Sequence, residues 1–221
     1  RARDPAHYRA RYAARIGYVD SRIGRVLEDI DRLGLEQDTV VAFTSDHGEL
    51  LGEHEYYFQH GITVLQPVVH VPLILSGPGI RGGATVSRLA SNTDVMPTLL
   101  DLLEIAWDDL ARQMDGHSLM PALQGAPAGK GEDHPAYAMC ERTREWSVME
   151  GKYKFTISEP ALRKAGRLVD IEEDPAEEQD IAAREPRTAE RLRAGLLRFR
   201  STAPALLSEG QPERPEMTEE D

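Results

Sequence analysis

Residues 39–48, TVVAFTSDHG, are the strongest indication of the fold class of this chain. Its first seven residues form a short apolar run rich in β-branched side chains, which is typical of a strand buried on both faces. Residues 37–38, Gln-Asp, bound the run on one side, and Asp46-His47-Gly48 bound it on the other. We therefore predict a central, fully buried β-strand over residues 39–45.

Helical and extended patterns flank this strand. Residues 6–33 carry apolar side chains at steps of three and four, which predicts an amphipathic helix, and Gly34 fits the position that ends it. Residues 68–76 form a second apolar run that we expect to be a strand. Pro72 lies inside this run, so the strand should start, bulge or lie at a sheet edge there.

A further helix should begin at a cap on Thr93 or Asp94 and run to about Leu103. The resulting order of helix, strand, long loop, strand and helix indicates an α/β fold. Composition then divides the rest of the chain. We expect part of an α/β domain over residues 1–124, a Gly/Ala/Pro-rich linker over 125–132, a small subdomain over 133–207 and a disordered tail over 208–221.

The small subdomain should contain antiparallel strands and a helix. Residues 146–149 and 152–157 flank Glu150-Gly151 and predict a hairpin. Residues 168–171 predict another strand, and residues 187–199 place apolar side chains on one face of a helix.

Composition excludes several classes of protein. The formal net charge is −12, which argues against a nucleic-acid binder with its basic surface. No apolar run approaches the ~20 residues that span a bilayer. Cys140 is the only cysteine, so no intrachain disulfide can form, and we expect a buried thiol in a strand. Residue 1 is Arg and the helical pattern starts almost at once, so we expect the natural chain to begin earlier.

Asp46 and His47 are the candidate metal ligands. They directly follow the predicted strand, at the end where ligands bind in α/β sheets. A carboxylate supplies charge and a neutral imidazole supplies a second donor to a divalent cation. The alternative is that Asp46 caps a helix, with Glu49 as its capping-box partner.

Three histidines lie within 14 residues, which raises the alternative of a zinc site: His47, His54 and His60. Their spacings of seven and six residues lack the i, i+4 pairing of a helical zinc site, and this disfavours it.

The segment TSDHGELLGEH, residues 44–54, resembles the metal-site segment of sulfatases in the alkaline phosphatase superfamily. Other segments resemble the same family and follow in its order, so that the resemblance covers about residues 8–200. They are GYVD at 17–20, FQHG at 58–61, HVPLI at 70–74, GPG at 77–79, DVMPTLL at 94–100, DGHSL at 115–119 and DIEEDP at 170–175.

The resemblance implies a fold and an activity. The fold would be part of an alkaline-phosphatase-like sandwich, a mixed, largely parallel sheet flanked by helices, plus a small C-terminal α+β subdomain. The activity would be metal-dependent hydrolysis of small-molecule or carbohydrate sulfate esters by the parent protein. The alternatives are a phosphodiesterase or phosphonate monoester hydrolase of the same superfamily, and a non-catalytic sulfatase-like protein.

The resemblance also implies roles for individual residues. Asp46 and His47 match one of two ligand pairs around a single divalent cation, usually Ca²⁺, with Mg²⁺ or Mn²⁺ as alternatives. His60 matches a histidine that serves as general acid or binds a sulfate oxygen, and imidazole chemistry suits proton transfer. His70 replaces an arginine of many relatives, and we expect it to pack or lie on the surface. Leu65-Gln66-Pro67 replaces a family Tyr-Glu-Glu run.

The family's nucleophile is a cysteine oxidised to formylglycine, in the motif Cys, any residue, Pro or Ala, any residue, Arg. The segment CERTR at 140–144 has Arg in the third place and follows the Asp-His pair instead of preceding it. We therefore expect no nucleophile in this chain. It should be the C-terminal portion of a sulfatase and inactive alone.

Overall fold

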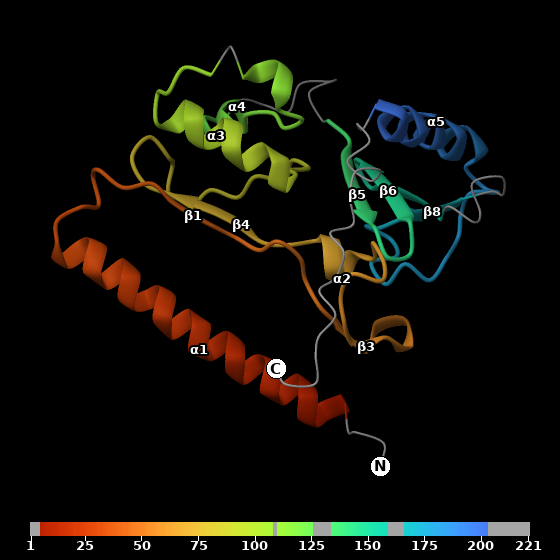
Figure 1. Ribbon diagram of the computed structural model, residues 1–221, viewed down its shortest axis with the longest axis horizontal. Coiled ribbons are helices and arrows are strands. Elements are labelled where there is room, and N and C mark those ends of the chain that lie inside the picture. The colour runs from red at the N-terminus through yellow and green to blue at the C-terminus, as the bar shows by residue number, and fades with distance from the viewer. Residues whose placement is uncertain (1–4, 108–109, 126–133, 159–165, 203–221) are drawn as a thin grey trace, which may run out of the picture.

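The computed structural model describes residues 5–107, 110–125, 134–158 and 166–202. Its elements form two groups (Figure 1). One surrounds the strand pair β1–β4, and the other is built on a four-stranded sheet of strands β5 to β8. The mixture of helices and strands confirms the α/β class.

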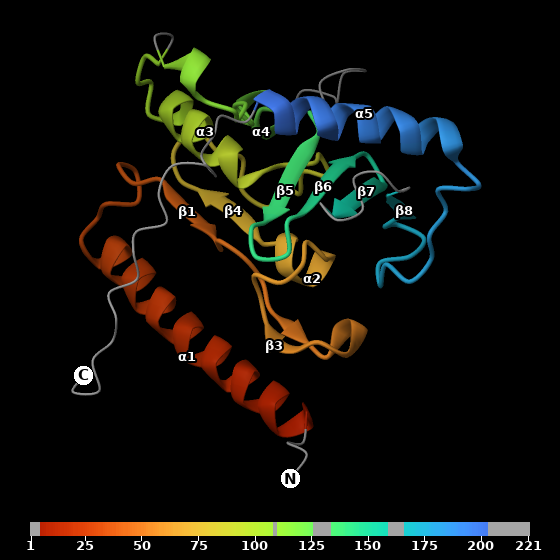
Figure 2. The ribbon, with the colours of Figure 1, turned by 45° about the vertical axis from the view of Figure 1, so that its right-hand side comes forward.

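Helix α1, Pro5–Arg32, confirms the first predicted helix. Gly34 adopts φ 69°, the left-handed conformation that ends helices and that glycine tolerates best. None of the residues of α1 is buried. Figure 1 and Figure 2 show the helix on the side of β1–β4 opposite to α3. Its first turns contact residues 51–58, because the Tyr8 ring lies 4.6 Å from that of Phe58 and Arg9 Nε donates to the Leu51 carbonyl at 2.8 Å. Farther along the helix apolar side chains are open to solvent, including Ile16 and Val26.

Strands β1, Val41–Thr44, and β4, Leu73–Ser76, pair antiparallel, from Val41 opposite Ser76 to Thr44 opposite Leu73. Two expectations were wrong here. Every described strand pair in the chain is antiparallel, whereas the resemblance implied a largely parallel sheet. Strand β1 is largely exposed instead of buried on both faces, because β4 is its one strand neighbour among the described residues.

The predicted strand over residues 68–76 is partly wrong. Residues 66–69 form a short helix, α2, Gln66–Val69, and the strand begins only after Pro72. Pro67 explains the helical turn, because proline fits the first turn of a helix, where its missing N–H costs nothing.

Helix α3, Val95–Leu102, confirms the next predicted helix, and Asp94 stands at its cap position as predicted, although the Asp94 side chain makes no cap hydrogen bond to α3. A 3-10 turn, η2, Asn92–Asp94, precedes the helix, and Ser91 caps this turn. Ser91 accepts a bond from Thr93 N–H, and the Asp94 carboxylate accepts the Ser91 N–H at 2.8 Å.

Short elements connect these pieces. Strands β2, Leu50–Leu51, and β3, Tyr57–Gln59, pair antiparallel with an irregular register, and the turn η1, Glu53–Glu55, lies between them. After α3 come the 3-10 turn η3, Ala111–Gln113, and helix α4, Met120–Leu123.

The C-terminal sheet is a four-stranded antiparallel meander, and helix α5, Pro186–Thr202, packs on it. The predicted hairpin, the strand near residue 168 and the last helix are confirmed. The strands are β5, Ala136–Cys140, β6, Glu145–Glu150, β7, Tyr153–Ser158, and β8, Arg167–Asp170.

Apolar side chains from β6, β7, β8 and α5 form the main core: Trp146, Val148, Phe155, Ile157, Leu168, Leu192 and Leu196. Most of the predicted linker at 125–132 and all of the predicted tail at 208–221 lie outside the described residues. Among the residues that are described, no helix has both the length and the apolar character needed to cross a bilayer.

Candidate functional site

The loop that follows β1 carries Asp46 and His47, and backbone contacts hold it in place. The Gly48 N–H donates to the Val68 carbonyl at 2.7 Å. A side chain at residue 48 would lie 2.0 Å from the Pro67 carbonyl oxygen, so only glycine allows this approach. The loop is therefore pressed against α2.

A second set of contacts anchors the start of the same loop. Asn92 Nδ2 donates to the Ser45 carbonyl at 2.9 Å, and Thr44 Oγ1 donates to Asn92 Oδ1 at 3.2 Å. The turn that precedes α3 thus holds one end of the loop, and α2 holds the other.

The Asp46 carboxylate is exposed and ionised. Its Oδ1 accepts the His47 N–H at 2.9 Å, and this bond, aided by the His47 ring, holds the pKa of Asp46 below its ordinary value. No helix starts at residue 46, so the helix-cap alternative is wrong. The side chain is 86% exposed, which leaves the second oxygen, Oδ2, available for a ligand.

The His47 ring has a defined orientation. Its Nδ1 lies 2.8 Å from the Gly48 carbonyl oxygen, and because a carbonyl only accepts, Nδ1 carries the proton. In the neutral ring Nε2 then presents a lone pair, and it lies 3.7 Å from Asp46 Oδ2. The carboxylate and the imidazole together form a two-donor set that fits a divalent cation.

His60 lies against this pair. Its ring stacks on that of His47 with centroids 4.2 Å apart and an interplanar angle of 19°. His60 Nδ1 lies 3.0 Å from Glu49 Oε2 and donates to it, so Nε2 remains free for other partners. The structure thus brings together the three residues that the sequence singled out, Asp46, His47 and His60.

Glu49, the partner of His60, belongs to the site although the sequence pattern did not indicate it. Leu50 pairs with Gln59 in β2–β3, so the next position of the antiparallel ladder brings residue 49 beside residue 60. A hairpin prediction over residues 50–59 would have found this contact. The other carboxylate oxygen, Oε1, is buried and has no hydrogen-bond partner among the described residues.

His54 does not join the other two histidines. It adopts φ 50° in the η1 turn, and its Nε2 lies 2.7 Å from the Ala176 carbonyl oxygen in the C-terminal group. The turn after β2 directs the side chain away from the site, so the three-histidine zinc site is wrong. Across residues 5–107, 110–125, 134–158 and 166–202, no group of three or more His, Cys, Asp or Glu side chains is arranged to hold a metal.

A hollow of 1590 Å³ adjoins the site and is lined from both groups of elements, including Asp46, His47, His60 and His70. His70 is exposed there, in keeping with the surface position expected of it. Cys140 is a free thiol at the end of β5 and is 5% exposed, as predicted for a buried thiol.

Comparisons with known proteins show which proteins this chain resembles. Residues 1–105 match the family model described as Sulfatase. Arylsulfatase K of Danio rerio is 31% identical over 80% of this chain and 34% of its own length. Choline-sulfatase of Rhizobium meliloti is 32% identical over 79% of this chain and 33% of its own length. The chain spans about a third of the length of the curated relatives it matches.

Solved structures share the fold. A phosphonate monoester hydrolase of Agrobacterium radiobacter superimposes with a TM-score of 0.69 and 28% identity, over 90% of this chain and 42% of that one. A 2-O GAG sulfatase superimposes with a TM-score of 0.69 and 26% identity, over 83% of this chain and 40% of that one.

Proposed function

The chain belongs to the sulfatase family of the alkaline phosphatase superfamily, and on that premise we propose that the whole protein hydrolyses sulfate esters with the help of a divalent cation. In this proposal, residues 1–221 supply two metal ligands, Asp46 and His47, and a general acid, His60. The observation that carries the proposal is the contact of the His60 ring with the ring of His47 at 4.2 Å, beside an ionised carboxylate.

The proposed cation is Ca²⁺, which the resemblance to sulfatases implies, with Mg²⁺ and Mn²⁺ as the alternatives. Asp46 Oδ2 and His47 Nε2, which lie 3.7 Å apart, are the two donor atoms of this chain that would hold it. When bound, such a cation polarises the sulfate oxygens and favours attack at sulfur.

His60 would protonate the oxygen of the leaving alcohol, or bind a sulfate oxygen. Its Nδ1 is occupied by Glu49, whose carboxylate fixes the ring orientation and would balance the positive charge of an imidazolium. The remaining nitrogen, Nε2, is the atom that would deliver the proton. Glu49 acts on the reaction only through His60.

No nucleophile is proposed among the 221 residues. Cys140, the one cysteine, is buried in β5, and a nucleophilic thiol needs both access and a group that favours the thiolate. We therefore expect the chain by itself to be inactive. The substrates proposed for the whole protein are small-molecule or carbohydrate sulfate esters. The names of relatives, a choline-sulfatase and an arylsulfatase, support this class.

The proposal is tested by calcium-dependent hydrolysis of 4-nitrophenyl sulfate by the whole protein. Chelation should abolish hydrolysis, and added Ca²⁺ should restore it. Asp46→Asn should raise the Ca²⁺ concentration for half-maximal rate by roughly tenfold or more, because the site loses a charged ligand. His60→Asn should leave that concentration unchanged and lower kcat by about 10²-fold or more.

Asp38→Asn is the matched control, because Asp38 is an exposed carboxylate in the loop before β1. It should behave as the unmodified protein does. The proposed metal site is ruled out if hydrolysis continues in the presence of a chelator. It is also ruled out if Asp46→Asn and Asp38→Asn need the same Ca²⁺ concentration for half-maximal rate.

A second candidate activity is hydrolysis of phosphonate monoesters or phosphate diesters. The structural match over 90% of this chain to a phosphonate monoester hydrolase favours it. A substrate panel distinguishes the two. The sulfatase proposal requires a higher kcat/KM for phenyl sulfates than for the corresponding phenyl phosphonates, and the reverse order would favour the second candidate.

A further inference from the structure

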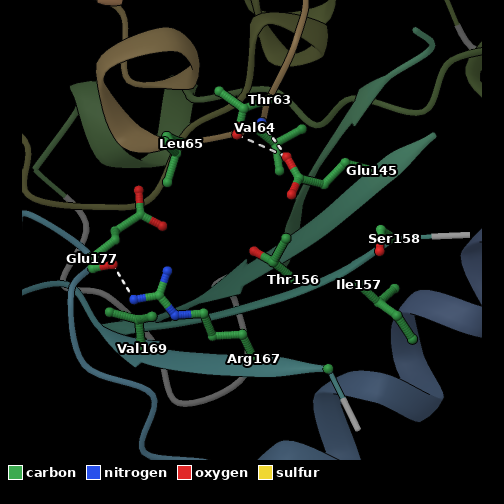
Figure 3. Close-up of a pocket in the computed structure, with 11 residues that line it drawn as sticks. Thr63, Val64, Leu65, Glu145, Thr156, Ile157, Ser158, Arg167, Val169 and Glu177 are labelled. Carbon is green, nitrogen blue, oxygen red and sulfur yellow. Dashed lines mark hydrogen bonds between the residues drawn. The ribbon is translucent and has the colours of Figure 1, made fainter. Parts of the chain in front are cut away.

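Charged side chains of the C-terminal sheet converge on residues 63–66, which follow the His60 turn. Glu145 of β6 accepts a hydrogen bond from Thr63 Oγ1 at 2.8 Å and another from the Val64 N–H at 2.9 Å. Figure 3 shows these two bonds at the rim of a cavity of 210 Å³ between residues 63–65 and the sheet.

Lys154 of β7 and Glu177, which follows β8, bind the same segment as an ion pair. Lys154 Nζ lies 2.9 Å from Glu177 Oε2 and donates to the Val64 carbonyl at 2.5 Å. Glu177 Oε1 accepts the Gln66 N–H at 2.5 Å. Glu145, Lys154 and Glu177 therefore bind three backbone groups of residues 63–66, in a stretch that belongs to no strand.

Stability alone does not account for this ion pair. Lys154 is 1% exposed and Glu177 is 3% exposed, and burial lowers the pKa of Lys154 against the attraction of Glu177. Replacing a buried ion pair with apolar side chains of similar size is often neutral or stabilising. What apolar side chains cannot supply is the set of directional bonds to the backbone of residues 63–66.

Residues 63–66 lie in the sequence between His60 and Val68, the residue that supports the loop of His47. His60 precedes them by three residues. Val68 follows them by two residues, and its carbonyl accepts the N–H of Gly48, the neighbour of His47. A displacement of residues 63–66 would therefore move His60 and the support of His47 relative to each other.

We infer that Glu145, Lys154 and Glu177 are positioning residues, which hold residues 63–66 so that His60 stays stacked on His47 beside the metal ligands. The inference rests on the proposed function of His60 as general acid. None of the three side chains needs to contact the substrate, since each acts through the backbone and side chains of residues 63–66.

The test compares kcat for phenyl sulfate and 4-nitrophenyl sulfate in the catalytically active protein that contains residues 1–221. Phenolate is the poorer leaving group and depends more on protonation. The double variant Lys154→Met with Glu177→Leu removes both charges together, so that no unpaired charge stays buried. We expect the ratio of kcat for phenyl sulfate to kcat for 4-nitrophenyl sulfate to fall about 10-fold or more.

Glu145→Gln is the second variant, because glutamine keeps the size of the side chain and one acceptor oxygen. It should lower the same ratio by a smaller factor. The control is Arg191→Met, which breaks the 2.6 Å ion pair between Arg191 of α5 and Glu150 of β6. Both groups belong to the same sheet region but bind none of residues 63–66, so the ratio should stay unchanged.

His60→Asn separates the two proposals. If His60→Asn lowers the ratio and the double variant leaves it unchanged, the positioning role is wrong and the general acid stands. If His60→Asn itself leaves the ratio unchanged, the general-acid role and the positioning role both fail. A fall in the ratio that Arg191→Met reproduces would also overturn the positioning role, because it would report general destabilisation of the sheet.

Discussion

Gly48 links the loop of Asp46 and His47 to α2 through its N–H and through the absence of a side chain. A methyl group there would lie 2.0 Å from the Pro67 carbonyl oxygen. Gly48→Ala should therefore force the loop and α2 apart and lower the free energy of unfolding by about 1–3 kcal/mol. Chemical denaturation measures the change, and calcium affinity of the whole protein should fall with it.

Gly82→Ala is the control for this substitution. Gly82 lies in the turn after β4, where a methyl group would meet no other atom within 4 Å, and its backbone is not left-handed. Its replacement should leave both the free energy of unfolding and the calcium affinity unchanged. Equal behaviour of the two alanine variants would show that the close approach at residue 48 is not required.

At the scale of elements, the strand β8 and the β6–β7 hairpin are joined by the ion pair of Lys152 and Asp170 at 2.6 Å. The hydrogen bond from Lys152 lowers the pKa of Asp170 from 3.8, and the same bond raises the pKa of Lys152 from 10.5. A carboxyl group with a lowered pKa stabilises the fold above its unfolded pKa and loses that effect as pH falls. A lysine with a raised pKa loses its effect only as pH rises through the folded pKa.

The pair should therefore stabilise the sheet from about pH 4 to about pH 10. The difference in free energy of unfolding between the unmodified chain and Lys152→Met should be constant between about pH 5 and pH 9 and shrink below about pH 4. Denaturation at several pH values measures it. Arg81→Met, at an exposed turn, should show no such dependence, and a difference that grows on acidification would contradict the assignment.

At the scale of the whole molecule, the N-terminal group leaves apolar surface open. Ile16 is 57% exposed and Val26 is 60% exposed on α1, while Ile74 of β4 is 59% exposed. Surfaces of this kind associate in solution. The isolated chain should therefore bind a hydrophobic dye and self-associate, as light scattering would show.

Ile16→Lys with Val26→Lys should reduce self-association and change the free energy of unfolding by no more than ~0.5 kcal/mol, because neither side chain is buried in this chain. Val148→Lys, at a position that is 1% exposed in the C-terminal core, should instead prevent folding of that sheet. A monodisperse chain that binds no dye would show that the apolar face of α1 is covered.

Much of the candidate site could be predicted from local sequence. Asp46 and His47 follow an apolar β-branched run, and strand ends are where α/β folds bind ligands. The boundaries of α1, the hairpin of β6 and β7, and α5 were likewise evident, because periodicity and turn residues are local signals. The role of His60 rested on resemblance, and its contact with His47 emerged only from the folded chain.

Contacts between residues far apart in the sequence could be found only in the folded chain. Glu49 contacts His60, and His54 turns toward Ala176 instead. Lys154 and Glu177 bind residues 63–66. These contacts join positions that no sequence period relates. The antiparallel direction of β1 and β4 and the exposure of β1 were also beyond local patterns. The physical reason is that hydrophobic spacing specifies which face of an element is apolar, whereas the path of the chain between elements specifies what that face and its neighbouring polar groups contact.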